Sequence, residues 1–287
     1  MIRLGGIVDG LPNDRDPRKL ARSHAAFGYT ASNAPYDISI SDTDYLRDYR
    51  EAFAAEDVTI AEVGVWKNII APEDDVRAAN FAYACERLAV ADELGATCCI
   101  NWMGSVKPGE RRGPHPDNLS SIGFDRTVEA IRKLIDAVKP KRTKYTLEIM
   151  QFLLPDSADS YLELLRAVDR PQFAVHLDPV NCILTPRMYF ANSSVIKHCF
   201  DILGPWIVSC HAKDIVMGDG FGLRLDEAIP GKGILDYPTF LTEIAKLPGD
   251  IPLMMEHLKD CEYAQGRDFI YDIGRKSGVS FRTPRPS

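Results

Sequence analysis

The stretch FAVHLDPVN spans Phe173 to Asn181 and begins with an apolar, β-branched run of the length of a strand. The run leads directly to Asp178, and Pro179 stops it from continuing as a regular strand. Carboxylates are rarely buried unless they are paired or bind a metal. Asp178 is therefore either a helix cap or a residue that faces a cation, and other strands that end in the same way would favour the cation.

Strand-like runs and helical patterns alternate along the whole chain. We expect strands at 4–8, 32–38, 58–66, 97–102, 145–150, 173–177, 207–211 and 251–256. We expect a helix after each of them, at 16–28, 42–56, 74–94, 124–138, 157–168, 195–203, 237–247 and 262–276. Eight such units predict an α/β fold, a single-domain (β/α)8 TIM barrel, because neighbouring parallel strands need a crossover that a helix supplies.

An open doubly wound sheet is the alternative fold. Its nucleotide-binding versions lose support because no GxGxxG follows the first strand and no GxxxxGK[ST] occurs in the sequence. No compositional break marks a second domain, so we assign residues 1–277 to the barrel. Residues 278–287, which end in FRTPRPS, carry Pro and Arg without periodicity and are expected to form a loose C-terminal tail.

The composition favours small-molecule chemistry in an ordinary globular protein, with 45% hydrophobic residues and a net charge of −7. A broad nucleic-acid footprint would need clustered Lys and Arg, so no nucleic-acid partner is expected. No apolar run reaches the roughly 20 residues that span a bilayer, and no signal-peptide pattern opens the sequence, so we expect a cytoplasmic protein without membrane contact. The seven cysteines show no CxxC spacing and are expected to be reduced thiols.

Four of the expected strands end in residue types that bind metals. These residues are Glu148, Asp178, His211 and Glu256, and their separations of 30, 33 and 45 residues are about one strand-helix unit each. The carboxyl ends of barrel strands line one mouth, so these side chains should converge there. Three converging carboxylates repel unless a cation neutralises them, and oxygen ligands with one imidazole suit Mn²⁺, Mg²⁺ or Co²⁺.

Each of these residues also has a plainer interpretation. Glu148 could pair with a surface lysine, and His211 could be a satisfied histidine near the core. Glu256 competes with the adjacent His257 for the inward position. Their recurrence at equivalent positions on consecutive strands favours the metal site, because such groups are costly to bury.

Further candidates for substrate binding lie close to this set. Lys213 follows the histidine by two residues, so it shares that strand face and can donate to a substrate oxygen, unless it is solvent-exposed. His176 faces the same way as Asp178 and is expected to bind substrate or to support the metal ligands. Trp66 and Trp102 end the third and fourth strands, where they can form an aromatic wall against a sugar ring or pack into the core.

The segment 103–121, MGSVKPGERRGPHPDNLSS, is too long for a simple connection and is interpreted as a lid. Its Arg111, Arg112 and His115 can meet a phosphate or a carboxylate, and a solvated loop is the alternative.

Several motifs together carry a family resemblance. They are LEIM around Glu148, HLDPVN around Asp178, CHAKD around His211, PGKGILDY from Pro230 to Tyr237, and MEH around Glu256. Over nearly its whole length the chain resembles the xylose isomerase-like TIM barrels, in particular the sugar phosphate isomerase/epimerase group that includes ketose 3-epimerases, hydroxypyruvate isomerase and inosose dehydratase.

The resemblance implies one divalent metal ion, Mn²⁺ first and Mg²⁺ or Co²⁺ as alternatives, held by Glu148, Asp178, His211 and Glu256. It also implies a carbohydrate substrate, and an isomerase or epimerase reaction in which Glu148 and Glu256 exchange a proton at the carbon next to the carbonyl. In PGKGILDY, Gly231 and Gly233 are expected to serve the backbone conformation.

Two positions depart from the pattern of ketose 3-epimerases. Asn181 stands where they have a substrate-binding histidine, and Leu154 stands where they have a further glutamate. A lyase on the same barrel, of the inosose dehydratase or C-glycoside deglycosidase kind, is therefore the alternative function. A non-catalytic barrel, a homo-oligomer and a complex with a second subunit also stay open. Endonuclease IV shares the barrel, but its trinuclear zinc site needs more histidines than this acidic chain, with six in all, can supply.

Overall fold

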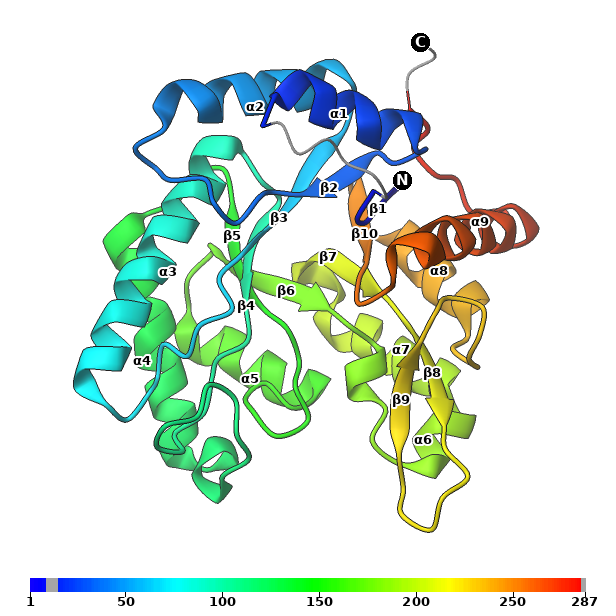
Figure 1. The fold of residues 1–287 in the computed structure, drawn as a ribbon. Helices are drawn as coiled ribbons and strands as arrows, with labels where there is room; N and C mark the ends of the chain where they lie inside the picture. The colour runs from blue at the N-terminus through cyan, green and yellow to red at the C-terminus, as the bar shows by residue number, and fades with distance from the viewer. Residues whose placement is uncertain (9–14, 285–287) are drawn as a thin grey trace.

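Eight short strands pair side by side in parallel, and β1 pairs with both β2 and β10, which closes a barrel (Figure 1). The computed structural model describes residues 1–8 and 15–284. The barrel strands are β1 (Ile2–Gly5), β2 (Ala31–Asn33), β3 (Thr59–Gly64), β4 (Cys98–Asn101), β5 (Lys144–Leu147), β6 (Phe173–Leu177), β7 (Ile207–Ala212) and β10 (Ile251–Met255). The predicted single-domain (β/α)8 TIM barrel is thus confirmed.

An outer layer of helices covers the barrel, because each helix has one apolar face to bury. In α4, for example, Val128, Ile131, Leu134 and Ile135 are buried. The α-helices are α1 (Pro17–Ala26), α2 (Thr43–Ala55), α3 (Asp74–Leu94), α4 (Ser121–Val138), α5 (Ala158–Val168), α6 (Pro186–Phe190), α7 (Asn192–Leu203), α8 (Tyr237–Lys246) and α9 (Asp260–Lys276). Short 3₁₀ turns are η1 (Pro116–Leu119), η2 (Val180–Cys182) and η3 (Gly204–Trp206).

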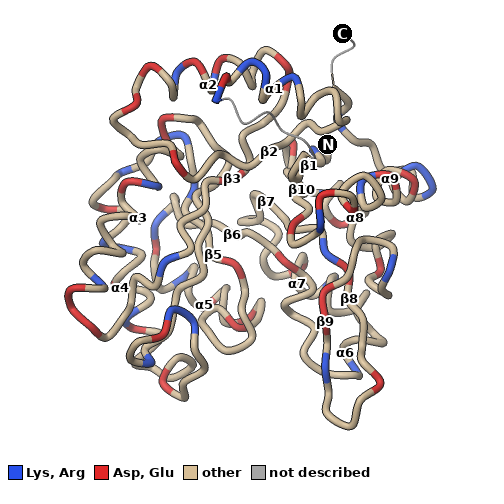
Figure 2. The backbone as a smooth tube through the Cα atoms, viewed as in Figure 1, with Lys and Arg blue, Asp and Glu red and all other residues tan. Residues whose placement is uncertain are grey.

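The polar faces of the helices carry both signs of charge. Lys and Arg alternate with Asp and Glu along the outer helices (Figure 2). Over the described part of the chain, none of the helices combines the length and the apolar composition that a membrane crossing requires.

The structure contains one element that the sequence interpretation treated as a loop. β8 (Asp214–Met217) and β9 (Leu225–Ala228) form an antiparallel hairpin that projects from the barrel beside α6 (Figure 1). The second barrel strand is also shorter than expected, because it ends at Asn33.

Asp214 fixes the base of this hairpin to the segment that contains PGKG. Its carboxylate accepts hydrogen bonds from the backbone N–H groups of Gly231 at 2.8 Å, Gly233 at 3.0 Å and Leu235 at 2.9 Å. Gly231 has a φ of +90°, and a Cβ on Gly233 would lie 2.3 Å from Asp214 Oδ1. Both glycines are therefore required by the backbone, as expected.

Ion pairs hold the amino-terminal ends of the strands together. Arg3 on β1 contacts Asp57 at 3.0 Å and Asp250 at 2.9 Å, and Arg282 contacts Asp57 at 2.6 Å. Arg282 also donates its backbone N–H to the carbonyl of Ile2 at 2.8 Å. This part of the C-terminal segment is thus bound to the barrel rather than loose, and residues 285–287 of the expected tail lie outside the described residues.

The pKa of Asp57 is displaced by these contacts. Burial alone would raise the pKa of Asp57, but the hydrogen bonds and charges of Arg282 and Arg3 outweigh burial and lower it below 3.8. A carboxylate with a lowered folded-state pKa contributes stability above its unfolded pKa, and this stability is lost as the pH falls through the folded pKa.

We expect Asp57→Asn to destabilise the protein at pH 7 by about 1.5–3 kcal/mol, because two arginines lose a charged acceptor. The difference from wild type should shrink as the pH falls below about 4, where the wild-type carboxyl also becomes neutral. Calorimetric unfolding at pH 7 and pH 3 measures both. Asp44→Asn, which removes an exposed pair with Arg47, should change little at either pH. An equal loss at both pH values for Asp57→Asn would contradict the electrostatic explanation.

Candidate metal centre and active site

The carboxyl ends of four neighbouring strands bring the predicted metal ligands together. Glu148 follows β5, Asp178 follows β6, His211 lies on β7 and Glu256 follows β10, and these strands are consecutive around the barrel. The Nδ1 atom of His211 lies 3.0 Å from Glu256, 3.3 Å from Glu148 and 3.7 Å from Asp178. The four side chains therefore form one cluster at the barrel mouth.

Lys213 enters the same cluster. Its Nζ atom lies 2.6 Å from Glu256 Oε1, 2.8 Å from Asp178 Oδ2 and 3.4 Å from Glu148 Oε1. The side chain is only 2% exposed, so it is not the solvated lysine of the plainer interpretation. It supplies one positive charge to carboxylates that would otherwise repel one another.

The two cations displace the pKa values of the carboxyls unequally. Burial would raise the pKa of Glu256, but His211 and Lys213 outweigh burial and hold it well below its usual range. Burial opposes the same two cations at Asp178, whose pKa is lowered. At Glu148 burial outweighs them and raises the pKa. Burial would lower the pKa of His211, but the surrounding carboxylates, Glu256 first, raise it well above its ordinary value.

The cluster fits one divalent cation. Its three carboxylates bring three negative charges and Lys213 balances one, so a divalent ion with a neutral His211 would balance the rest. Glu256 Oε1 is buried and accepts no hydrogen bond of regular geometry. The ligand atoms lie within 4.8 Å of one another, near the separation of about 4 Å between opposite ligands of an ion with bonds of about 2.1 Å.

The two carboxylate oxygens of Asp178 have different partners, one in the backbone that follows β6 and one in the charged cluster. Its Oδ1 atom accepts the backbone N–H of Val180, the first residue of η2, at 3.0 Å, while Oδ2 faces Lys213. Asn181 completes the arrangement, because its Nδ2 donates to Glu148 at 3.1 Å and to Asp178 at 3.3 Å. The side-chain amide thus holds two carboxylates in place.

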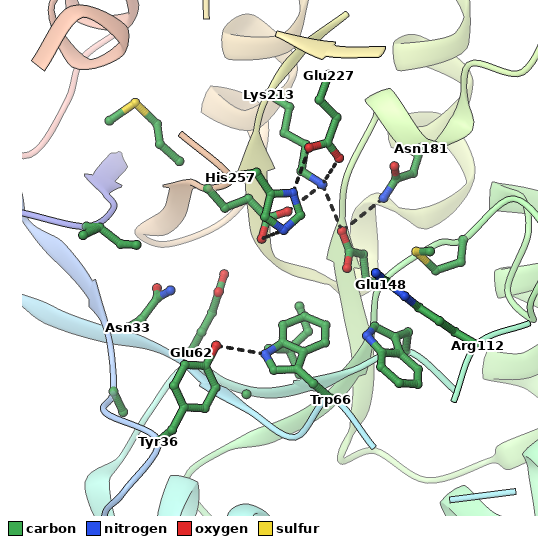
Figure 3. Close-up of a pocket in the computed structure, with 18 of the residues that line it drawn as sticks. Asn33, Tyr36, Glu62, Trp66, Arg112, Glu148, Asn181, Lys213, Glu227 and His257 are labelled. Atoms are coloured by element: carbon green, nitrogen blue, oxygen red, sulfur yellow. Dashed lines mark hydrogen bonds and ion pairs between the residues drawn. The ribbon is translucent and has the colours of Figure 1, made fainter. Parts of the chain in front are cut away.

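A cavity of about 440 Å³ opens above the cluster (Figure 3), within the range of about 300–1,000 Å³ that is typical of small-molecule sites. Lys213, Glu227 and His257 meet on one side of it, and Trp66 and Tyr36 lie on the other (Figure 3). The residues that line it include Asn33, Tyr36, Glu62, Trp66, Trp102, Arg111, Arg112, Glu148, Gln151, Asn181, Lys213, Glu227, Glu256, His257 and Tyr263.

Two tryptophans form part of the cavity wall, as the aromatic-wall hypothesis requires. Trp66 has a φ of +52°, and its Nε1 donates to the hydroxyl of Tyr36 at 3.1 Å. The indole folds back over the end of β3, where a Cβ on Gly64 would lie 2.3 Å from it. Trp102 is almost fully buried, and the guanidinium of Arg111 lies 5.2 Å from the centre of its ring.

The expected lid segment contributes Arg111 and Arg112 to the cavity wall. Buried hydrogen bonds hold this segment: Ser105 Oγ donates to the carbonyl of Gly113 at 2.6 Å, and Asn118 Nδ2 donates to the same carbonyl at 3.0 Å. Among the described residues, neither arginine has an ion-pair partner, so both guanidinium groups are available to a ligand.

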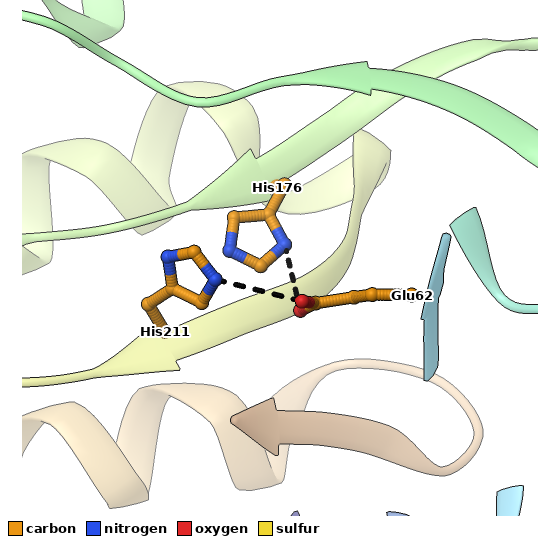
Figure 4. Close-up of side chains that lie close together, drawn as sticks. All are labelled: Glu62, His176 and His211. Carbon is orange, nitrogen blue, oxygen red and sulfur yellow. Dashed lines mark ion pairs between the residues drawn. The ribbon is translucent and has the colours of Figure 1, made fainter. Parts of the chain in front are cut away.

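His176 is placed differently from the other substrate-binding candidates. Its side chain is fully buried inside the barrel below the cavity, against His211 and Glu62 (Figure 4). Of the two roles suggested for it, this position suits support of the metal ligands, because a ligand in the cavity does not reach it.

Sequence reasoning missed two residues of the site, Glu227 and Glu62. Glu227 pairs with Lys213 at 2.9 Å and with His257 at 2.8 Å, but it lies on the hairpin that was interpreted as a loop. Glu62 lies within the apolar run VTIAEVGVW, and a lone acid inside such a run was the signal that could have identified it. Of the two competing residues, Glu256 faces inward and lies 3.0 Å from His211, whereas the side chain of His257 is 61% exposed at the rim.

Comparisons with known proteins agree on the fold. A family model described as a xylose isomerase-like TIM barrel matches residues 22–273. No curated protein matches the chain.

Three solved structures illustrate the range of similar proteins. A D-psicose 3-epimerase with D-tagatose from Clostridium cellulolyticum H10 is 14% identical, with a TM-score of 0.67 over 97% of this chain and 100% of that one. A xylose isomerase-like TIM barrel protein from Mycobacterium smegmatis in complex with magnesium is 14% identical, with a TM-score of 0.64 over 96% and 97%. Endonuclease IV from Thermus thermophilus is 14% identical, with a TM-score of 0.69 over 96% and 99%. At these identities the likeness shows the fold alone.

We expect chelated and dialysed protein to bind about one Mn²⁺ per chain, with Mg²⁺ or Co²⁺ able to compete, because the cluster offers one set of hard ligands. Asp178→Ala and Glu148→Ala should each abolish measurable binding in isothermal titration calorimetry. Asp159→Ala, which removes an exposed acid paired with His198 on the outer helices, is the matched control and should bind as wild type does. If the wild-type protein takes up no ion from excess Mn²⁺, the proposed metal centre is refuted.

Proposed function

The chain belongs to the xylose isomerase-like TIM-barrel family, and we propose that it is a divalent-metal-dependent isomerase or epimerase of a sugar or sugar-like ketose. The proposal combines the family with a cluster of ligands below a cavity of small-molecule size. A sugar-processing neighbour, the D-psicose 3-epimerase, supports a carbohydrate substrate.

The observation that carries the proposal is that two carboxylates from opposite ends of a four-strand arc line the same cavity. Glu148 and Glu256 stand at opposite ends of the four-strand arc β5, β6, β7 and β10, and both line the cavity. An epimerisation removes a proton from one face of a carbon and returns it to the other face. Two carboxylates that approach a bound molecule from different directions are the groups that this reaction needs.

Each residue then has a defined task. A divalent ion, when bound, would polarise the substrate carbonyl and offset the negative charge that develops on it. One of Glu148 and Glu256 takes the proton from the adjacent carbon, and the other returns a proton, with their roles exchanged in the reverse direction. Lys213 lines the cavity and can donate to a substrate oxygen, and the tryptophans can pack against the sugar ring.

A lyase on the same barrel is the second candidate, and two observations favour it. Asn181 is occupied with Glu148 and Asp178, so the amide does not replace the substrate contact of the histidine in ketose 3-epimerases. In addition, the His257–Glu227 pair at the rim lies where it can give a proton to a leaving oxygen. Removal of the same α-proton would then be followed by loss of water or of an aglycone.

Arg111 and Arg112, which have no ion-pair partner among the described residues, indicate an anionic group on the substrate. Arg111 and Arg112 line the cavity, and guanidinium groups bind phosphate and carboxylate through paired hydrogen bonds. The proposal therefore extends to a sugar that carries an anionic group, with this group directed toward the segment 103–121.

Incubation of the Mn²⁺-loaded protein in D₂O with a panel of ketoses and keto-sugars, followed by NMR and mass spectrometry, tests the reaction. Deuterium next to the carbonyl with an intact carbon skeleton supports the isomerase or epimerase, whereas loss of water or aglycone supports the lyase. Glu148→Gln and Glu256→Gln, compared at matched metal content, should slow exchange by about 10²–10⁴-fold. Glu163→Gln on the outer face of α5 is the control. No exchange and no elimination with any member of the panel would refute both reactions.

For the anionic group, the panel should include phosphorylated and carboxylated sugars beside neutral ones. Arg111→Gln and Arg112→Gln should each raise KM for the anionic substrates by about 10–100-fold, the range expected for a lost charged hydrogen bond, and should leave kcat nearly unchanged. Arg166→Gln on α5 is the matched control. Equal effects on neutral and anionic substrates would contradict the anion-binding role.

A further inference from the structure

We infer that Glu62 positions His211 by accepting the Nε2–H of its ring, which leaves the Nδ1 lone pair directed at the metal centre. This inference rests on the proposed metal centre and adds a residue that lies outside the four expected ligands. Glu62 is a positioning residue, because it acts through the imidazole.

The ring of His211 lies between two groups of carboxylates. Its Nδ1 atom faces Glu256 at 3.0 Å and Glu148 at 3.3 Å. Its Nε2 atom points the other way, into the barrel, where Glu62 Oε2 lies 3.6 Å away (Figure 4). The two nitrogens therefore have separate environments, one at the mouth and one in the interior.

Glu62 is buried beside this imidazole. It lies on β3, is 3% exposed, and has no Lys or Arg within ion-pair distance among the residues that the structure describes. Its Oε1 atom accepts a hydrogen bond from Ser209 Oγ at 3.2 Å and lies 3.4 Å from His176 Nδ1. A carboxylate buried without Lys or Arg needs donors: the hydroxyl of Ser209 is one, and the two imidazoles are the nearest further groups that can carry an N–H.

A neutral imidazole carries one N–H, and the hydrogen bond made by one nitrogen decides which nitrogen can bind a metal. A carboxylate beside Nε2 favours the proton on that atom. The Nδ1 lone pair of His211 then faces the three carboxylates of the centre, as a metal ligand requires. Carboxylate–histidine–metal arrangements of this kind also make the imidazole a stronger ligand.

His176 packs beside the contact between Glu62 and His211. Its ring packs edge-on against His211, with centroids 4.0 Å apart and an angle of 66° between the rings. Neither of its nitrogens makes a hydrogen bond of regular geometry. Glu62, His176 and His211 also offer three ligand atoms within 4.8 Å, but an ion there would occupy Nε2 of His211 and exclude the N–H that Glu62 accepts.

The test compares wild type, Glu62→Gln and the control Glu163→Gln by calorimetric Mn²⁺ titration and by histidine-selective ¹⁵N NMR of the metal-free and Zn²⁺-loaded proteins. The His211 signals are assigned with His211→Gln. We expect the Nε2–H tautomer in the Zn²⁺-loaded wild type, and in the metal-free wild type at a pH above the raised pKa of His211, where the ring is neutral. In Glu62→Gln we expect a mixture of tautomers and about 10–100-fold weaker Mn²⁺ binding, with unfolding temperature and circular dichroism used to confirm the fold.

The outcomes separate the two levels of inference. A wild-type protein that binds no ion removes the metal centre itself. Wild-type binding combined with an unchanged affinity and tautomer in Glu62→Gln overturns the positioning role alone. Two ions per chain, with the second lost in His176→Gln, would also overturn it, because Nε2 would then be a metal ligand.

Discussion

The constraint on which the rest of the site depends is the repulsion among three carboxylates that the barrel brings to one point. Glu148, Asp178 and Glu256 come from different strands, so no local hydrogen bonding within one element can separate their charges. The positive charges of Lys213 and of protonated His211 offset these charges, and Asn181 adds neutral donors. The backbone geometry of eight paired strands keeps the groups from moving apart, so fold stability and site electrostatics are coupled.

Much of this arrangement could be read from the sequence, because it rests on local patterns. The run FAVHL ending in Asp178 predicts a buried strand with a charged end, and three other strands repeat the pattern. The hairpin β8–β9 was missed because the glycines between Met217 and Leu225 dominate that segment and indicate a loop. Short β-type runs on both sides of such a turn are weak signals alone.

Contacts between distant strands were harder to predict. Glu62 and Ser209 are separated by 147 residues, and only the closed barrel places β3 across from β7. The position of Trp66 depends on a positive φ and on a glycine two residues before it, which no periodicity reveals. Periodicity likewise does not reveal which of Glu256 and His257 faces inward.

The two ends of β10 carry carboxylates with different functions. Asp250 precedes the strand and pairs with Arg3 at the closed end of the barrel, while Glu256 follows it and faces the cavity. Five apolar residues separate the two carboxylates, so their fields are largely independent. Substitutions at the carboxyl end of the strand can therefore change the ligands of the site, while the ion pair at the amino-terminal end continues to stabilise the barrel.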